Sequence, residues 1–187
     1  MLKKMRGFTL IELLIVVAII GILAALLIPN ALEAIQKAKQ KSAMKEIVTI
    51  ATACADYMTD HGDFTAVAQD GPIAAANPFM LAMSSFYVKV IPVNDPWNNP
   101  YNVFLGATAV IAVVSGADAN EIGDDDFVVE SWGRDKGPGP NYQASTYATD
   151  TPEAGRYNVS KMADFNEDLV NWNGSWIVGP SSVAVGS

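Results

Sequence analysis

Residues 8–30 read FTLIELLIVVAIIGILAALLIPN, and this stretch decides the architecture of the chain. Between Phe8 and Ile28 the only charged residue is Glu12. A helix needs roughly 20 apolar residues to span a bilayer, so this stretch is long enough to cross a membrane. Residues 1–7, MLKKMRG, place three positive charges directly ahead of it. The positive-inside rule keeps these charges in the cytoplasm and puts the rest of the chain on the other side.

The length of the apolar stretch separates it from a conventional secretory signal. Such a signal has an apolar core of roughly 7–15 residues, followed by a cleavage site with small residues. Here the apolar run is longer and continues into an amphipathic pattern without such a site. The stretch therefore predicts a helix that remains in the protein as a membrane anchor.

Glu12 is unusual inside an apolar segment. A carboxylate in the middle of a membrane helix costs about 2.5–3.5 kcal/mol on insertion scales, and such residues are usually paired and functional. One interpretation places Glu12 near the interface, where its carboxylate reaches the headgroups. We favour the other interpretation, in which Glu12 pairs with a positive group at the same depth.

Pro29 lies within the helical pattern. Proline lacks an N–H and removes a helical hydrogen bond, so it kinks or locally melts a helix. The alternative is that the helix ends at this residue. We favour a continuous helix with a weak point, because the helical pattern continues after Pro29.

Residues 30–62 predict the amphipathic half of the same helix. Apolar residues recur on one helical face, namely Ile47, Ile50, Ala51, Cys54 and Met58. Four lysines lie on the other side, at positions 37, 39, 41 and 45. Gly62 is a typical residue to follow a helix C-terminus. We expect one helix from Phe8 to His61, with residues 8–29 as its hydrophobic half.

Residues 63–187 form a C-terminal domain that we expect to be rich in β-structure. Turn signals separate short runs with strand character at Tyr101–Leu105, Ala109–Ser115, Phe127–Trp132 and Trp172–Val178. Residues 133–158 are rich in Gly, Pro, Ser, Thr and Tyr and predict a long loop. The expected fold class is α+β, with a long N-terminal helix packed on a small antiparallel β-sheet.

Charge and motif content argue against two classes of function. After position 46 there are 17 acidic residues and five basic ones, so the domain lacks the basic surface that nucleic-acid binding needs. Catalysis is not expected either. The single histidine, His61, lies seven residues from the single cysteine, Cys54, and no nucleophile, P-loop or zinc-protease motif is present. Cys54 cannot form a disulfide within the chain, and its apolar neighbours predict a core thiol.

The N-terminal region resembles the signal and first helix of the type IV pilin-like superfamily. The resemblance rests on GFTLIE at 7–12 and the apolar residues that follow it. It implies that a prepilin peptidase cleaves between Gly7 and Phe8, removes the leader 1–7, and methylates the new Phe8 amine. It also implies that Glu12 neutralises the N-terminal amine of a neighbouring subunit. The helix near Pro29 would partly unwind on assembly.

Three segments of the domain are similar to the major pseudopilins of type II secretion systems. They are DPWNNPYNVF at 95–104, FVVESWGRD at 127–135 and DLVNW at 168–172. Their order and approximate spacing match that group. The resemblance is therefore closest to the major pseudopilins.

The same resemblance implies a calcium site. Calcium takes six to eight oxygen ligands, so carboxylates and carbonyls must gather around it. The family's ligand positions fall on or near Asp135, Asp164, Asn166 and Asp168, with backbone oxygens around Ser131. The loop from Asp135 to Asp168 is longer than in the family, and an expected aspartate is missing. A second acidic run, 118–126, begins like an EF-hand loop but lacks required ligands, so it predicts a solvated turn.

These resemblances imply a structural filament subunit, the major pseudopilin of a type II secretion system. The expected partners are further copies of the chain, prepilin peptidase, an inner-membrane assembly platform, minor pseudopilins and the membrane. The expected location is the bacterial inner membrane, with the C-terminal domain in the periplasm or in an extracellular filament. Two alternatives stay open. One is a type IV pilus subunit for adhesion, motility or DNA uptake, and the other is a membrane-anchored binding protein that does not polymerise. The lack of a disulfide favours the pseudopilin over the pilin.

Overall fold

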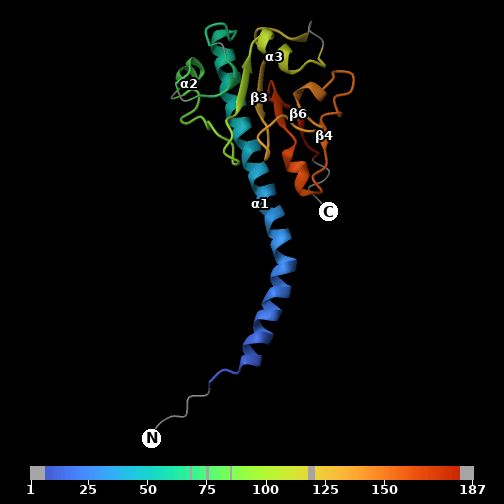
Figure 1. Ribbon diagram of the computed structural model, residues 1–187. Helices are drawn as coiled ribbons and strands as arrows, with labels where there is room; N and C mark the ends of the chain where they lie inside the picture. The colour runs from blue at the N-terminus through green and yellow to red at the C-terminus, as the bar shows by residue number, and fades with distance from the viewer. Residues whose placement is uncertain (1–6, 68, 75, 85, 118–120, 182–187) are drawn as a thin grey trace. The chain divides into compact units, whose positions relative to one another are not determined.

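The computed structural model describes residues 7–67, 69–74, 76–84, 86–117 and 121–181 (Figure 1). The chain divides into two compact units, residues 1–36 and residues 37–187. Helix α1 (Leu10–His61) contributes to both units and confirms the expected long helix apart from its first two residues.

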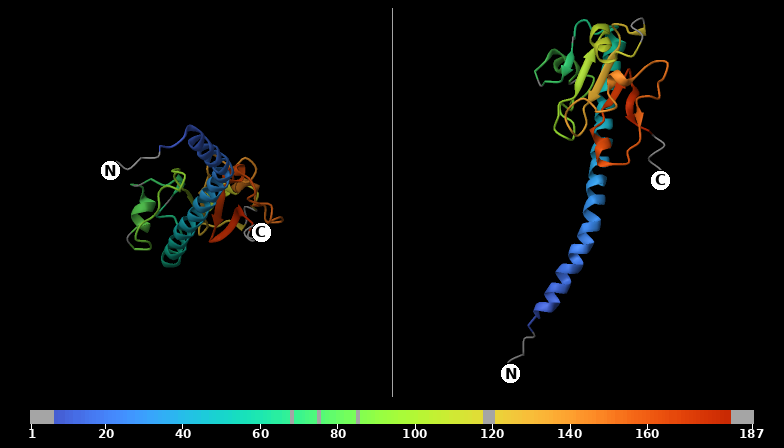
Figure 2. Two further views of the ribbon diagram at one scale, coloured as in Figure 1. Left: turned by 90° about the horizontal axis from the view of Figure 1, so that it is seen from below. Right: turned by 45° about the vertical axis from the view of Figure 1, so that its right-hand side comes forward.

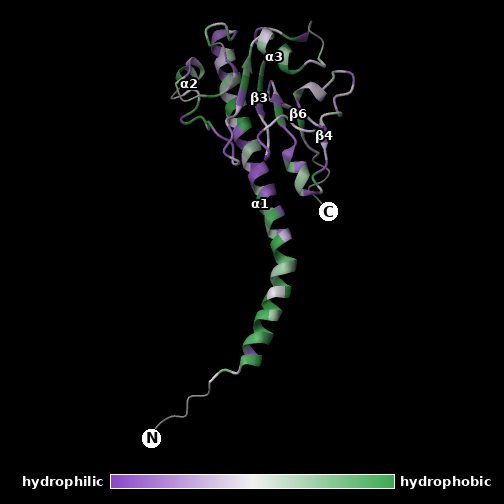
Figure 3. Ribbon diagram, viewed as in Figure 1, coloured by the Kyte–Doolittle hydropathy of each residue, from purple (hydrophilic) through white to green (hydrophobic). Residues whose placement is uncertain are grey.

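In the first unit, α1 is apolar and exposed to its surroundings. Its large apolar side chains from Leu10 to Leu32 are all at least 47% exposed, and Figure 3 shows this half of the helix as hydrophobic. Among the described residues, α1 is the one helix that is long and apolar enough to cross a membrane. The helix continues through Pro29, so the alternative of a helix boundary at this residue is wrong.

In the second unit, α1 buries the face that its periodicity predicts. Ile47, Ile50 and Cys54 are fully buried, and Met58 is half-buried against the same core. The helix ends at His61, and Gly62 follows it with a φ of 83° and an N–H that donates to the carbonyl of Met58 at 2.8 Å. Glycine adopts this left-handed conformation without steric penalty, which explains its place after the last turn.

The second unit contains a six-stranded sheet in the order β1-β2-β3-β5-β6-β4. The strands are β1 (Asp70–Pro72), β2 (Asn102–Leu105), β3 (Phe127–Ser131), β4 (Arg156–Tyr157), β5 (Leu169–Trp172) and β6 (Ser175–Pro180). All neighbours are antiparallel except β4 and β6, which are parallel, with Arg156 opposite Gly179. The sheet is therefore mixed rather than purely antiparallel, because a short strand within the predicted 133–158 loop runs beside β6 in the same direction.

The sheet separates two apolar layers. Side chains alternate between the faces of a strand, so Val103, Val129 and Leu169 pack with α1 on one face. Val128 and Val170 point to the other face, where they pack with α3 (Ala107–Val113) and with residues of the long connection before β5. Figures 1 and 2 show α1 and the sheet side by side in this unit.

The structure corrects the expected strand at Ala109–Ser115. These residues lie in and just after helix α3, which begins after Gly106. Gly106 has a φ of 80° and turns the chain out of β2. Strand β2 pairs directly with β3, so residues 109–115 do not lie between them in the sheet. Val110 is buried as part of helix α3 instead.

The structure also corrects the expected single strand Trp172–Val178, because this segment contains the turn of a hairpin. Asn173 and Gly174 have φ values of 48° and 84° and join β5 to β6. Two consecutive residues with positive φ form a type I′ turn, whose twist matches the twist of the two strands that it joins. Asn-Gly is the sequence most typical of this turn. Two further short elements, β1 and helix α2 (Pro78–Met83), complete the fold.

Candidate functional site

The predicted cleavage position lies ahead of the first helix. Gly7 and Phe8 precede α1 in a non-helical segment, and the Phe8 side chain is 85% exposed. No atom lies within 4 Å of the position that a Cβ would occupy at Gly7. Among the described residues, the Gly7–Phe8 bond is therefore non-helical and sterically open, as a proteolytic substrate must be.

Glu12 and Thr9 cap the N-terminus of α1 reciprocally. The backbone N–H and the hydroxyl of Thr9 donate to Glu12 Oε2 at 2.8 and 2.7 Å, and the Glu12 N–H donates to Thr9 Oγ1 at 3.3 Å. This is a capping box, in which a threonine and a glutamate three residues later satisfy unpaired N–H groups of a helix start. The sequence carries this signal as Thr9-x-x-Glu12, although the sequence analysis did not use it. In the single subunit, Glu12 is thus held by its own chain.

The second group of candidate residues lies where β3 ends and β5 begins. Ser131 pairs with Leu169 in this ladder, and Glu130 pairs with Val170. Asp168 precedes β5 and is two residues from Val170, so its side chain and that of Glu130 are on the same face. Register thus brings together two acidic residues that are 38 positions apart in the sequence.

Asp168 is fully buried, and neither of its carboxylate oxygens accepts a hydrogen bond from a described residue. Burial, and then the charge of Glu130, raises its pKa to about 9. The N–H of Gly139 approaches the carboxylate and opposes this shift, without the alignment of a hydrogen bond. An ionised carboxylate in such a place needs a positive partner, since burial of an unpaired charge is strongly unfavourable.

Glu130 is the residue that the sequence analysis missed. It is 5% exposed, and its Oε2 accepts hydrogen bonds from Trp132 Nε1 at 2.9 Å and from Asn102 Nδ2 at 3.3 Å. Burial raises its pKa, and its carboxyl group is close enough to Asp168 to hydrogen-bond with it when one of them is protonated. No short motif predicts this pair, because it arises from the strand register alone.

Two of the four predicted calcium ligands have other partners. Asp164 Oδ2 accepts from the N–H groups of Ser160 and Lys161 at 2.7 and 2.8 Å, which caps a short 3-10 helix. Asn166 Oδ1 accepts from Arg134 Nε at 2.9 Å. The structure therefore holds these two side chains in local contacts rather than around a common centre.

Asp135 lies nearer to the buried pair. It is exposed, and its charge contributes to the raised pKa of Asp168. Among the residues that the structure describes, no three Asp, Glu, His or Cys side chains are arranged as a ready metal cage. A cation here would need backbone carbonyls and water beside Asp168 and Asp135. The two unpaired oxygens of Asp168 fit that role, while Asp164 and Asn166 do not in their present contacts.

Fold and N-terminal geometry together define a class of protein. A basic leader precedes an open Gly-Phe bond, and a capped apolar helix follows it. The second half of that helix packs on a small sheet. These are the features of a membrane-anchored, pilin-like subunit.

Comparison with known proteins narrows this class. Residues 2–28 match the family model of the prokaryotic N-terminal methylation motif. The chain is 34% identical to the type II secretion system core protein G of Aeromonas hydrophila, over 67% of this chain and 92% of that protein. It is 35% identical to the Vibrio cholerae protein of the same name, over 66% and 90% of the two chains. Identity to the one from Escherichia coli K12 is 31%, over 71% and 94%. No solved structure gives a significant match.

The chain belongs to the family of type II secretion system core protein G, the major pseudopilins.

Proposed function

We propose that this chain is the major pseudopilin of a type II secretion system, a subunit that polymerises through its N-terminal helix. The observation that carries the proposal is the capped, exposed apolar half of α1, in a chain with the N-terminal methylation motif. An apolar surface of this size is stable only in a membrane or against other helices. The same surface serves as the membrane anchor before assembly and as the filament core afterwards.

Processing precedes assembly in this proposal. Prepilin peptidase cuts the exposed Gly7–Phe8 bond and methylates the Phe8 amine on the cytoplasmic side. The C-terminal domain then lies in the periplasm, as the positive charges of residues 1–7 favour. An inner-membrane assembly platform and minor pseudopilins are the proposed partners in filament growth.

Glu12 gives the assembly step its specificity. Cleavage produces a positive amine at Phe8, four residues before Glu12, while the Glu12 carboxylate is held at the start of α1 by Thr9. A neighbouring subunit in the filament can bring its own amine to this carboxylate. Exchange of the capping contact for this ion pair neutralises both charges within an apolar surrounding, where the attraction is strongest.

Substitution of Glu12 tests the proposal. In cells that contain the secretion machinery, Glu12→Ala should still insert and be cleaved before Phe8, because the substitution makes the helix more apolar, although it also removes the capping contacts with Thr9. Filament yield, measured by electron microscopy of sheared material, should fall to background. The matched control is Glu33→Gln, which removes a carboxylate from the same helix outside the apolar stretch and should still assemble.

Mass spectrometry of both variants reports whether the chain begins at a methylated Phe8. Normal filaments from processed Glu12→Ala protein would refute the assembly role of Glu12. A wild-type chain that is inserted and processed but forms no filaments would instead leave the membrane-anchored binding protein that does not polymerise as the better description.

Calcium binding is the second part of the proposal. Asp168 and Asp135 would hold the ion at the end of the β3–β5 ladder, together with backbone carbonyls near Ser131. When bound, calcium would supply positive charge to the buried carboxylate of Asp168, which accepts no hydrogen bond from any residue that the structure describes. Its role would be to tie the long connection 133–166 to the end of the sheet.

A further inference from the structure

Two buried carboxyl groups share the end of the β3–β5 ladder without a basic partner. Glu130 is 5% exposed and Asp168 is fully buried. The nearby basic side chains point elsewhere, since Arg134 donates to Asn166 and Lys136 Nζ donates to the carbonyl of Asn98. Within the described residues, neither carboxyl group forms an ion pair with lysine or arginine.

Three arrangements can stabilise such a pair. A lysine or arginine can neutralise it, the two groups can share one proton, or a cation can bridge them. The first is absent from the described residues. The other two make different demands, because a shared proton needs only the two side chains, whereas a cation needs oxygens that no other donor occupies.

The carboxylate oxygens of Asp168 and Glu130 include oxygens that could bind a cation. Both oxygens of Asp168 are buried, and within the part of the chain that the structure describes they accept no hydrogen bond. The hydrogen bonds that Glu130 accepts from described residues, those from Trp132 and Asn102, end on Oε2. These two donors fix the orientation of the carboxylate, as outer hydrogen bonds do for metal ligands, and Oε1 is the oxygen that we assign to the ion.

We propose that Glu130 is a direct ligand of the divalent cation, bridging it with Asp168 beside Trp132. The inference rests on the calcium proposal above and extends it, because Glu130 lies outside the set of ligands that the family resemblance implies. With Glu130 as a ligand, the ion would lie closer to the sheet than the loop residues Asp164 and Asn166 would place it. A hard cation such as calcium is the chemical class that two carboxylates, carbonyls and water select.

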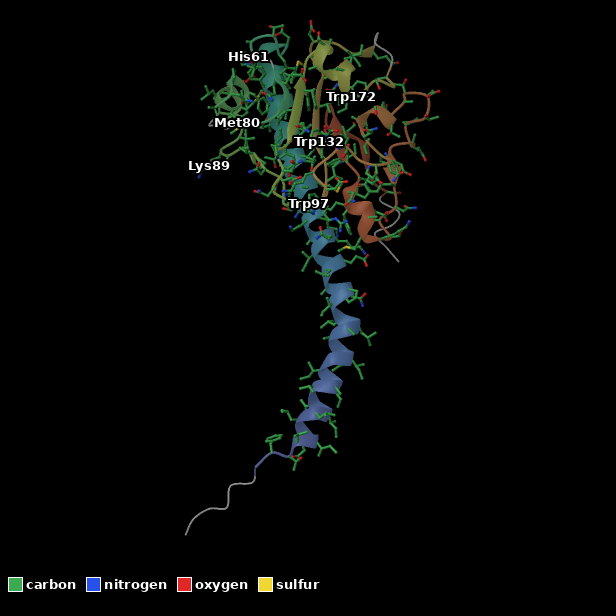
Figure 4. The ribbon with its side chains drawn as sticks, viewed as in Figure 1. His61, Met80, Lys89, Trp97, Trp132 and Trp172 are labelled. Atoms are coloured by element: carbon green, nitrogen blue, oxygen red, sulfur yellow. The ribbon has the colours of Figure 1, made fainter. Side chains whose placement is uncertain are left out.

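The position of Trp132, which Figure 4 labels, provides a spectroscopic test. Its indole N–H contacts Glu130, so a luminescent lanthanide in the calcium site would lie next to the ring. We expect terbium, added to the full chain in detergent micelles after chelation, to emit when tryptophan is excited. Calcium should displace it. Trp132→Phe should remove most of this emission. Trp176→Phe, which changes a tryptophan on strand β6, should retain it.

Calcium affinity distinguishes the ligands. Calorimetric titration of Glu130→Gln should show affinity weakened by about 10- to 100-fold or more, the range seen when even outer partners of a metal are lost. Asp168→Asn should weaken it similarly. Asp164→Asn is the matched control and should bind calcium as the wild type does, because its carboxylate only caps the 3-10 helix.

The outcomes separate the two proposals. Unchanged affinity in Glu130→Gln, with loss in Asp168→Asn, would overturn the role of Glu130 and leave the calcium site standing. No calcium binding by the wild type would overturn both and would favour a shared proton. If Glu130→Gln does not fold, the terbium measurement with Trp132→Phe decides, and undiminished emission would overturn the inference. None of these results bears on filament assembly, which Glu12 tests separately.

Discussion

Tyr101 shows at the residue scale how a polar group is accommodated in the core between α1 and the sheet. It is fully buried, and its hydroxyl donates to Glu46 Oε2 at 2.8 Å. Burial, followed by this hydrogen bond and the charge of Glu46, raises the pKa of Tyr101 above its usual value. The hydroxyl therefore joins the sheet to α1 only while it keeps its proton.

Stability should depend on pH through Tyr101. Its pKa is raised in the folded state, while the unfolded tyrosine loses its proton near pH 10. This contribution is complete below about pH 10 and is lost as the pH rises further, by about 1.4 kcal/mol per pH unit. Denaturation of the wild type and of Tyr101→Phe between neutral and alkaline pH measures it. The variant should lose less stability above pH 10, and equal slopes would contradict the assignment.

At the scale of the element, α1 combines two requirements in one helix. Its first half presents apolar side chains on all sides, and its second half buries a single face. Pro29 lies near the change between the two. Because proline has no N–H, the carbonyl of Ala25 lacks its helical donor, which makes this turn the weakest part of the helix.

Pro29→Ala should strengthen that turn. The added N–H restores one helical hydrogen bond, so amide exchange around residues 25–32 should slow in detergent micelles. Membrane insertion should be unchanged. If local unwinding is part of assembly, filament yield should fall. Asn30→Ala is the control at the next position, and unaltered exchange and assembly in Pro29→Ala would remove Pro29 from the mechanism.

At the scale of the whole molecule, the buried core belongs to the second unit. Its fully buried residues on α1 begin at Ala43, and all other members of both apolar clusters come from residues 47 to 178. The first unit contributes no buried side chain among its described residues. Folding of the domain thus depends on packing within residues 37–187, and the apolar half of α1 depends on membrane or filament.

A fragment that begins at Lys37 should therefore fold by itself. We expect it to be soluble without detergent and to unfold in one cooperative thermal transition. A shorter fragment that begins at Ala51 is the control. It lacks Ile47 and Ile50, and each buried isoleucine contributes about 1.5–3 kcal/mol, so this fragment should lose the transition. A non-cooperative transition in the longer fragment would show that the domain needs residues 1–36.

Local patterns were sufficient for the parts of the molecule that depend on neighbours in the chain. An uninterrupted apolar run and a helical periodicity predict α1, and the strands β2 and β3 follow from short apolar runs between turn signals. The Gly7–Phe8 and Glu12 assignments also rest on consecutive residues. Asn173-Gly174 and Thr9-x-x-Glu12 are local signals as well, for a hairpin turn and a helix start.

By itself, then, the sequence determined the long helix, its two halves, the acidic sheet domain and the resemblance to pseudopilins, because each is encoded in residues close together along the chain. The tertiary structure was needed to show that helix α3 replaces the expected strand at 109–115, that β4 joins the sheet in parallel, and that Glu130 lies beside Asp168. Periodicity cannot specify these features. They depend on which strands pair and in which register, and that pairing is set by the packing of side chains distant in the sequence.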